Sequence, residues 1–164
     1  MERDIFFDSL YKSYFPKVYR LCKGYFNGDH DVASDATQEI FIKVWENLPK
    51  FRNESNISTW IFRISSNTCL LYLRKESYKK EVHTHQFADR TNEDYAQETD
   101  EQLVKVYNCI QKLEPTSKLI IMMVLESVPY DKIAEIIGIS DKTLRVRIHR
   151  IKTKLTKCVQ NGKI

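Results

Sequence analysis

Apolar residues recur every three or four positions through most of this chain, the spacing that gathers them on one face of an α-helix. No stretch alternates apolar and polar residues between hairpin-turn signals, as a half-buried strand would. We therefore expect an all-α protein. The pattern predicts helices over residues 4–13, 16–26, about 30–48, 58–75, 101–112, 115–126, 130–137 and 140–157.

Residues that begin helices mark several of these boundaries. Pro16 and Pro115 fit the first turn of a helix, Asp29 or Asp31 suits the cap of the third helix, and Ser58 suits the cap of the fourth. The third helix is expected to bury a row made of Ala33, Ala36, Ile40, Phe41, Val44, Trp45 and Leu48. The fourth is expected to bury Trp60, Ile61, Ile64, Thr68, Leu71 and Tyr72.

Residues 80–100 interrupt the helical pattern. The segment carries two basic and six acidic side chains and few branched aliphatic residues, which is typical of a flexible linker. It divides the chain into small helical domains at 1–79 and 101–164, each near the lower size limit for a core of its own. We expect the two domains to move independently.

Composition argues against several classes of protein. Acidic residues break the apolar run at the N-terminus, unlike in a signal peptide, and no window offers the ~18 uncharged apolar residues of a membrane-spanning helix. A cytoplasmic protein without membrane insertion is expected. The four cysteines lie forty or more residues apart, which favours reduced core thiols over a metal site. No phosphate loop, metal-ligand cluster or nucleophile elbow appears, so we expect no enzyme, cofactor or metal.

Basic residues gather near the C-terminus. The net charge is only +4, but residues 142–157 hold seven Lys or Arg and no acid, the footprint of a phosphate-backbone binder. Residues 130–137, a turn at Gly138 and a helix capped by Ser140 form the pattern of a helix-turn-helix. The outer face of its second helix offers Lys142, Thr143, Arg145, Val146, His149 and Arg150. Which arginine would meet a base and which a phosphate stays open.

Two further groups of residues lie in the N-terminal half. Beside its apolar row, the third helix carries acidic and amide groups around one isoleucine, a face suited to a basic protein helix: Asp35, Gln38, Glu39, Ile42 and Glu46. The loop and helix that follow mix aromatic, cationic and amide groups, which stack on and hydrogen-bond unpaired bases: Phe51, Arg52, Trp60, Phe62, Arg63 and Asn67. By spacing alone, Trp60 and Phe62 are more typical of a core.

The stretches DATQEIFIKVW, FRNESNISTWIFRISSNT and LYLRK resemble region two of extracytoplasmic-function sigma factors of bacterial RNA polymerase. The stretch LEPTSKLIIMMVLESVPYDKIAEIIGISDKTLRVRIHRIKTKL is similar to their region four. The resemblance implies three partners: core RNA polymerase, contacted at the β′ coiled coil and the β flap, promoter DNA, and an anti-sigma factor. It also implies that 1–79 binds the polymerase and the minus-ten element and that 101–164 binds the minus-thirty-five element.

The resemblance also implies roles for individual residues. Those at the β′ coiled coil would be Asp35, Gln38, Glu39, Ile42 and Glu46. Those at the melted minus-ten strand would be Phe51, Arg52, Trp60, Arg63 and Asn67. Those at the minus-thirty-five element would be Tyr130, Lys142, Thr143, Arg145, Val146, His149 and Arg150. Val146 replaces a serine frequent in the family, which predicts apolar contact with a thymine methyl.

A second interpretation is a transcription regulator with a helical sensor or dimerisation domain before its helix-turn-helix. It accounts for the C-terminal half equally well. It leaves the acidic helix and the aromatic loop of the N-terminal half unexplained.

Overall fold

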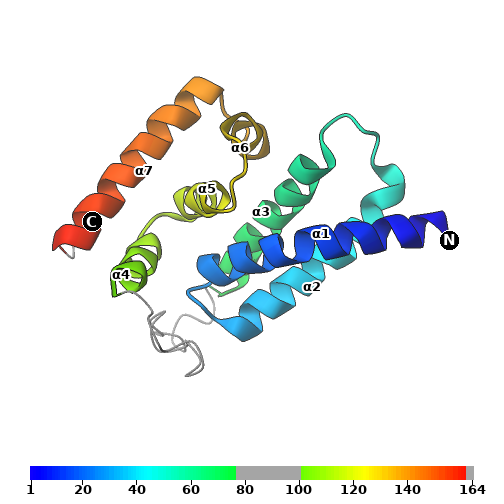
Figure 1. Ribbon diagram of the computed structural model, residues 1–164, viewed down its shortest axis with the longest axis horizontal. Helices are drawn as coiled ribbons and strands as arrows, with labels where there is room; N and C mark the ends of the chain where they lie inside the picture. The colour runs from blue at the N-terminus through cyan, green and yellow to red at the C-terminus, as the bar shows by residue number, and fades with distance from the viewer. Residues whose placement is uncertain (77–100, 162–164) are drawn as a thin grey trace.

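In a computed structural model, described here for residues 1–76 and 101–161, the chain is built of α-helices and one short 3-10 turn (Figure 1). No strand occurs within these two ranges, and the all-α expectation is confirmed. The predicted linker at 80–100 lies outside the described residues. In chain order, the elements are α1 (Glu2–Tyr25), α2 (His30–Asn47), η1 (Leu48–Lys50), α3 (Ile57–Glu76), α4 (Glu101–Ile110), α5 (Pro115–Leu125), α6 (Tyr130–Ile137) and α7 (Asp141–Asn161).

Helices α1, α2 and α3 form an N-terminal bundle around fully buried aliphatic residues such as Val18, Ile40 and Ile61. Asp29 caps α2, because its carboxylate accepts the backbone N–H of Val32 at 3.2 Å. The predicted cap of α3 is wrong. The side-chain oxygen of Asn56 accepts the backbone N–H of Ser58 at 2.8 Å, so the helix begins one residue before the serine.

Pro16 does not begin a new helix, and the predicted break between residues 13 and 16 is wrong. Helix α1 runs unbroken through this position. Pro16 is exposed, so water can reach the carbonyl of Lys12 that the proline leaves without an N–H partner. Its neighbour Phe15 packs against Phe41 of α2, with 6.0 Å between ring centroids. Burial of aromatic residues therefore outweighs the local cost of the proline.

Helix α3 buries small hydroxyl residues, of which Thr68 was expected in the core and Ser65 was not. Ser65 and Thr68 lie in the core and donate to the carbonyls four residues earlier, each at 2.8 Å. Because the helix itself satisfies these hydroxyls, they pack like small apolar groups. Leu71, predicted to be buried, is 44% exposed instead.

Helices α4 to α7 form a C-terminal bundle that contains the predicted helix-turn-helix. Helix α6 ends at Gly138, whose φ of 85° lies in the left-handed region and turns the chain toward α7. Ser140 then caps α7, its hydroxyl oxygen accepting the backbone N–H of Thr143 at 3.1 Å. Leu144 and Ile148 of α7 and Ile133 of α6 are buried. These boundaries match the sequence-based prediction.

The two bundles pack against each other in this structure, an arrangement that the sequence did not predict. Helix α1 contacts α5, and α3 contacts α6 (Figure 1). Arg20 donates two hydrogen bonds to the carboxylate of Glu126, both at 2.9 Å. Gln111 donates to the carbonyl of Gly24. A Cβ on Gly24 would clash with the end of the Met122 side chain, so a larger residue there would force that buried side chain to shift.

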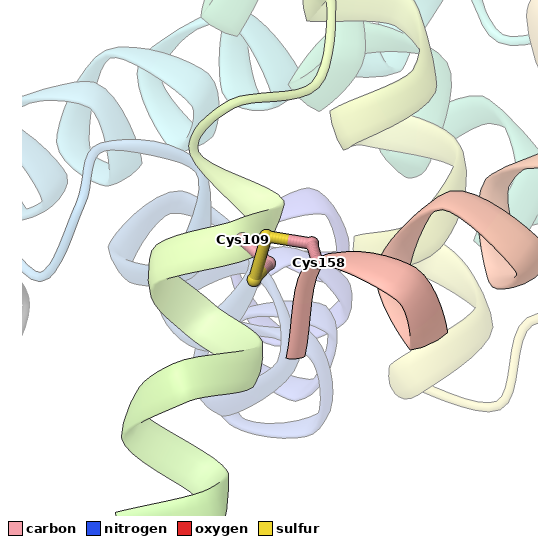
Figure 2. The surroundings of a disulfide bond; sticks show 2 residues. All are labelled: Cys109 and Cys158. Atoms are coloured by element: carbon pink, nitrogen blue, oxygen red, sulfur yellow. A yellow bond between two sulfur atoms is a disulfide. The ribbon is translucent and has the colours of Figure 1, made fainter. Parts of the chain in front are cut away.

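Cysteine pairing also departs from expectation. Cys109 of α4 and Cys158 of α7 form a disulfide (Figure 2), whereas four reduced cysteines were predicted. The two lie 49 residues apart in sequence, but packing of α4 on α7 brings their Cα atoms to 5.9 Å. Cys22 and Cys69 are free thiols buried in the N-terminal bundle.

Candidate nucleic-acid and polymerase interface

The outward side of α7 is a continuous basic face. Its inward side is fixed by the buried row Leu144, Ile148, Ile151 and Leu155, so residues at the remaining positions point away from the bundle. The six predicted contact residues of this helix are all exposed: Lys142, Thr143, Arg145, Val146, His149 and Arg150. The helix therefore offers one cationic surface with an apolar residue within it.

Tyr130, at the start of α6, contacts two basic residues of α7. The guanidinium of Arg145 lies 5.3 Å from the centroid of its ring, and Lys152 donates to its hydroxyl at 3.4 Å. Arg145 also pairs with Asp141 at 2.8 Å. Exposed pairs of this kind contribute little to stability. The ring and the aspartate therefore orient Arg145, but its ion pair with Asp141 is weak enough for a phosphate or a base edge to replace the aspartate.

Arg147, on the same helix, does not belong to the basic face. It is half-buried and donates to the carboxylate of Glu114, just before α5. Arg147, and after it Ser117, hold the pKa of Glu114 below its ordinary value. This arginine fixes α7 to the rest of the domain, which explains why one basic residue of the 142–157 segment faces inward.

The loop between η1 and α3 forms the second candidate surface. The ring of Phe51 lies 4.9 Å from that of Trp60, tilted by 37°, and both side chains are half-buried. A hollow of about 560 Å³ opens beside them. Its lining includes Phe6 of α1, Phe51, Asn53 and Asn56 of the loop, and Lys132 and Glu135 of α6. The part played by α6 was not predicted, because α6 is distant in sequence.

The other residues predicted for this surface separate into three environments. Arg52 and Asn67 are exposed. Arg63 is half-buried and donates to the backbone carbonyl of Glu135 at 3.5 Å. Phe62 is buried in the core, so it does not belong to the surface. In this structure α6 therefore covers part of the predicted minus-ten surface.

The acidic side of α2 is the third candidate surface. Asp35, Gln38, Ile42 and Glu46 are exposed, and the Ile42 side chain is an apolar point 55% exposed among acidic and amide groups. Glu39 is half-buried and pairs with Lys43 at 3.2 Å.

Tyr72 of α3 lies beside this acidic surface. Burial, and then the nearby carboxylate of Glu39, raise its pKa to about 12. Glu39 therefore also interacts with α3, and Asp35 of the same surface contributes more weakly to the raised pKa of Tyr72.

Within residues 1–76 and 101–161, no three His, Cys, Asp or Glu side chains lie together as a metal site would require. No helix in the same ranges combines the length and apolar character needed to cross a membrane.

Comparison with known proteins identifies the family. Residues 10–78 match the sigma-70 region 2 family, and residues 103–155 match the sigma-70 region 4 family. The chain is 30% identical over 142 residues to the extracytoplasmic-function sigma-E factor of Haemophilus influenzae, covering 77% of this chain and 74% of that protein. It is 25% identical over 158 residues to the sigma factor YlaC of Bacillus subtilis, covering 92% and 90%.

A solved structure shares the fold over nearly the whole chain. It is the sigma factor RpoE of Bartonella quintana in complex with the anti-sigma factor NepR. The TM-score is 0.76 at 20% identity, and the match covers 96% of this chain and 98% of that one. With both regions matched in order, the chain belongs to the extracytoplasmic-function sigma factors of the sigma-70 family, which direct promoter-specific initiation of transcription.

Proposed function

We propose that this sigma factor divides its work among the three surfaces described above. The exposed acidic side of α2 binds the β′ coiled coil of core RNA polymerase. The basic face of α7 reads the minus-thirty-five element, and the loop at residues 51–57 with α3 holds the melted minus-ten strand. The observation that carries this proposal is the separation of charge. One domain exposes a basic helix face suited to phosphates, and the other exposes an acidic face suited to a basic protein helix.

The packed arrangement must open before both promoter elements can be bound. Boxes about 25 base pairs apart are separated by roughly 85 Å of duplex. A compact chain of this length has a radius of gyration of only about 15 Å. In addition, Arg63 and the loop hollow face α6. Polymerase therefore acts by holding the two domains apart at a fixed separation.

Further partners follow from the same assignment. The C-terminal domain is proposed to contact the β flap while α7 lies on DNA. The Bartonella relative was solved with an anti-sigma factor bound, which supports an anti-sigma factor for this chain as well. A protein that works on RNA polymerase works in the cytoplasm. The function requires no catalytic residue, cofactor or metal.

The proposal is tested by gel shifts on promoter DNA with and without core polymerase. The free protein is expected to show little sequence-specific binding at physiological salt, because one small domain makes few phosphate contacts. When core polymerase holds both domains, binding of one domain to its box places the other domain close to the second box. The higher effective concentration should then produce a specific complex, although neither domain makes an additional contact with DNA. Lengthening the spacer between the two boxes by a few base pairs should weaken this complex.

A matched variant tests the polymerase surface in the same assay. Asp35→Lys combined with Gln38→Ala should abolish the polymerase-dependent shift while leaving the melting temperature nearly unchanged, because both residues are exposed. Asp8→Lys, a charge reversal on the exposed side of α1, serves as the control. Tight binding of the free protein to a palindromic site, indifferent to polymerase, would instead favour a dimeric regulator.

Substitutions in the two proposed DNA-binding surfaces should have different effects. Arg145→Ala or Arg150→Ala is expected to weaken minus-thirty-five recognition by about 1–3 kcal/mol if a bidentate base contact is lost. Lys157→Ala removes one charge from α7 outside the six-residue face and should have a smaller effect. Asn67→Ala should spare duplex binding and reduce strand opening, measured by permanganate footprinting on a supercoiled promoter. Normal opening by the Asn67→Ala variant would remove this residue from the minus-ten surface.

A further inference from the structure

The disulfide between Cys109 and Cys158 joins the first and last helices of the DNA-binding domain (Figure 2). Both side chains are nearly buried, at 4% and 1% exposure. Each nevertheless lies close to a helix end: Cys109 is the next-to-last residue of α4, and Cys158 lies three residues before the end of α7. Helix ends open locally at lower cost than helix centres, so a small thiol can reach these sulfur atoms.

The bond lies at the far end of the helix that carries the basic face. Cys158 completes the buried row of α7 that begins at Leu144. Helix α4, to which the bond attaches it, also lies at the domain interface, where Gln111 just beyond its end donates to Gly24 of α1. The disulfide therefore fixes the C-terminal end of α7 to an element that contacts both domains.

We propose that Cys109 and Cys158 form a reversible redox site that controls how firmly the recognition helix is held. This inference rests on the proposed function, because a protein that works on RNA polymerase works where glutathione and thioredoxins keep thiols reduced. In such a compartment, disulfides are usually transient and redox-sensing. Oxidation closes the bond and stabilises the C-terminal domain, and reduction releases the end of α7 from α4.

The proposed oxidant is a hydroperoxide and the proposed reductant is a thiol of the glutathione class. One cysteine thiolate attacks the terminal peroxide oxygen, which yields a sulfenic acid and, for hydrogen peroxide, a molecule of water. The second thiol attacks the sulfenic sulfur, forms the S–S bond and displaces a second water. Two electrons thus pass from two thiols to the peroxide. In the reverse direction, two glutathione thiols become one glutathione disulfide, and both cysteines regain their protons.

The second cysteine pair behaves differently and provides an internal reference. The sulfur atoms of Cys22 and Cys69 lie 3.9 Å apart, both fully buried within long helices of the N-terminal bundle. The neighbouring Cys22 and burial raise the pKa of the Cys69 thiol well above its ordinary value. Because the thiolate is the reactive form, this pair should remain reduced.

The test equilibrates the full-length protein in buffers of increasing reduced-to-oxidised glutathione ratio and counts free thiols by alkylation and mass spectrometry. The count should change from two to four across the series. Reduction opens a loop closed by residues 49 apart, so the melting temperature should fall by about 10 °C or more. Loss of hydrogen-exchange protection should concentrate in α4 and α7 and spare α2.

Alanine variants separate this site from the other thiols. Cys109→Ala and Cys158→Ala should each melt like the reduced protein in both buffers. Cys22→Ala should keep the full redox-dependent shift. A pair that stays oxidised in millimolar reduced glutathione, or reduced under excess oxidised glutathione, would overturn a reversible site. Conversion between the two states without a change in melting or exchange would overturn its control of the helix.

Promoter binding connects the redox site to function. With core polymerase, the oxidised protein should bind promoter DNA several-fold more tightly than the reduced protein at 37 °C. Equal binding in the two states would overturn control of recognition by this bond. Failure to bind in both states would instead overturn the proposed function. The thiol count and the melting shift need neither DNA nor polymerase, so the two failures are distinguishable.

Discussion

Replacing Arg20 by glutamate is expected to separate the two domains in solution. The guanidinium makes two 2.9 Å hydrogen bonds to Glu126, whose side chain is only 10% exposed, whereas that of Arg20 is 57% exposed. Arg20→Glu leaves a nearly buried carboxylate facing a second one. Allowing for solvent around the arginine, the packed arrangement should lose about 1–3 kcal/mol, roughly a 5- to 150-fold change in the ratio of packed to open molecules.

Small-angle X-ray scattering measures this opening directly. The radius of gyration should rise by several ångströms from the compact value of about 15 Å. Lys12→Glu makes the same charge change on α1 at an exposed pair with Asp8 and should leave the radius unchanged. Combining Arg20→Glu with Glu126→Arg should restore the compact form. A compact Arg20→Glu protein would mean that apolar contacts alone hold the domains together.

Removing the charge of Lys118 should stabilise the protein. This lysine of α5 is 8% exposed, and its ammonium lies 5.0 Å from the ring centroid of Tyr25 in the other domain. Burial lowers its pKa from the ordinary value of 10.5, because the charged form has lost water. Lys118→Met keeps the length of the side chain and should raise the free energy of unfolding by about 1–3 kcal/mol at neutral pH, measured by urea denaturation.

The pH dependence of stability provides an independent test of the same residue. The pKa of Lys118 is lower in the folded chain than in the unfolded chain, so between the two values the unfolded chain binds more protons. Stability attributable to this group therefore rises with pH across that interval, and the full penalty is present below it. The Lys118→Met variant should lack this slope. Lys105→Met, at an exposed position of α4, should retain it.

Local signals in the sequence were sufficient to locate the helix-turn-helix. Helix α6 runs from Tyr130 to Ile137 as predicted, because Pro129, Gly138 and Ser140 are strong boundary residues. Pro16 misled the same reasoning. The sequence shows only that proline disfavours the interior of a helix. Whether the helix continues also depends on the packing of α1 against α2, which outweighs this local effect here.

The interactions that the sequence did not predict are long-range. Arg20 and Glu126 are 106 residues apart, and periodicity identifies both as surface positions without indicating that they meet. The disulfide was missed for the same reason, since spacing along the chain does not report the distance between α4 and α7. Within the candidate surfaces, the exposed residues of α2 and α7 lie outside the apolar rows, as the spacing of apolar residues predicts. Arg63 and Glu39 are only half exposed because α6 and α3 pack beside them.

The residues on the two sides of the domain interface are far apart in sequence, and this separation also affects the order in which the two domains fold during synthesis. Helices α1, α2 and α3 contain a complete core and leave the ribosome before α5 is synthesised. The N-terminal bundle therefore folds first, with the surface around Gly24 and Tyr25 still bare, and the C-terminal domain docks onto it afterwards. A nascent chain halted after α3 has emerged but before α5 has done so presents to chaperones the same surface that α5 covers in the finished protein.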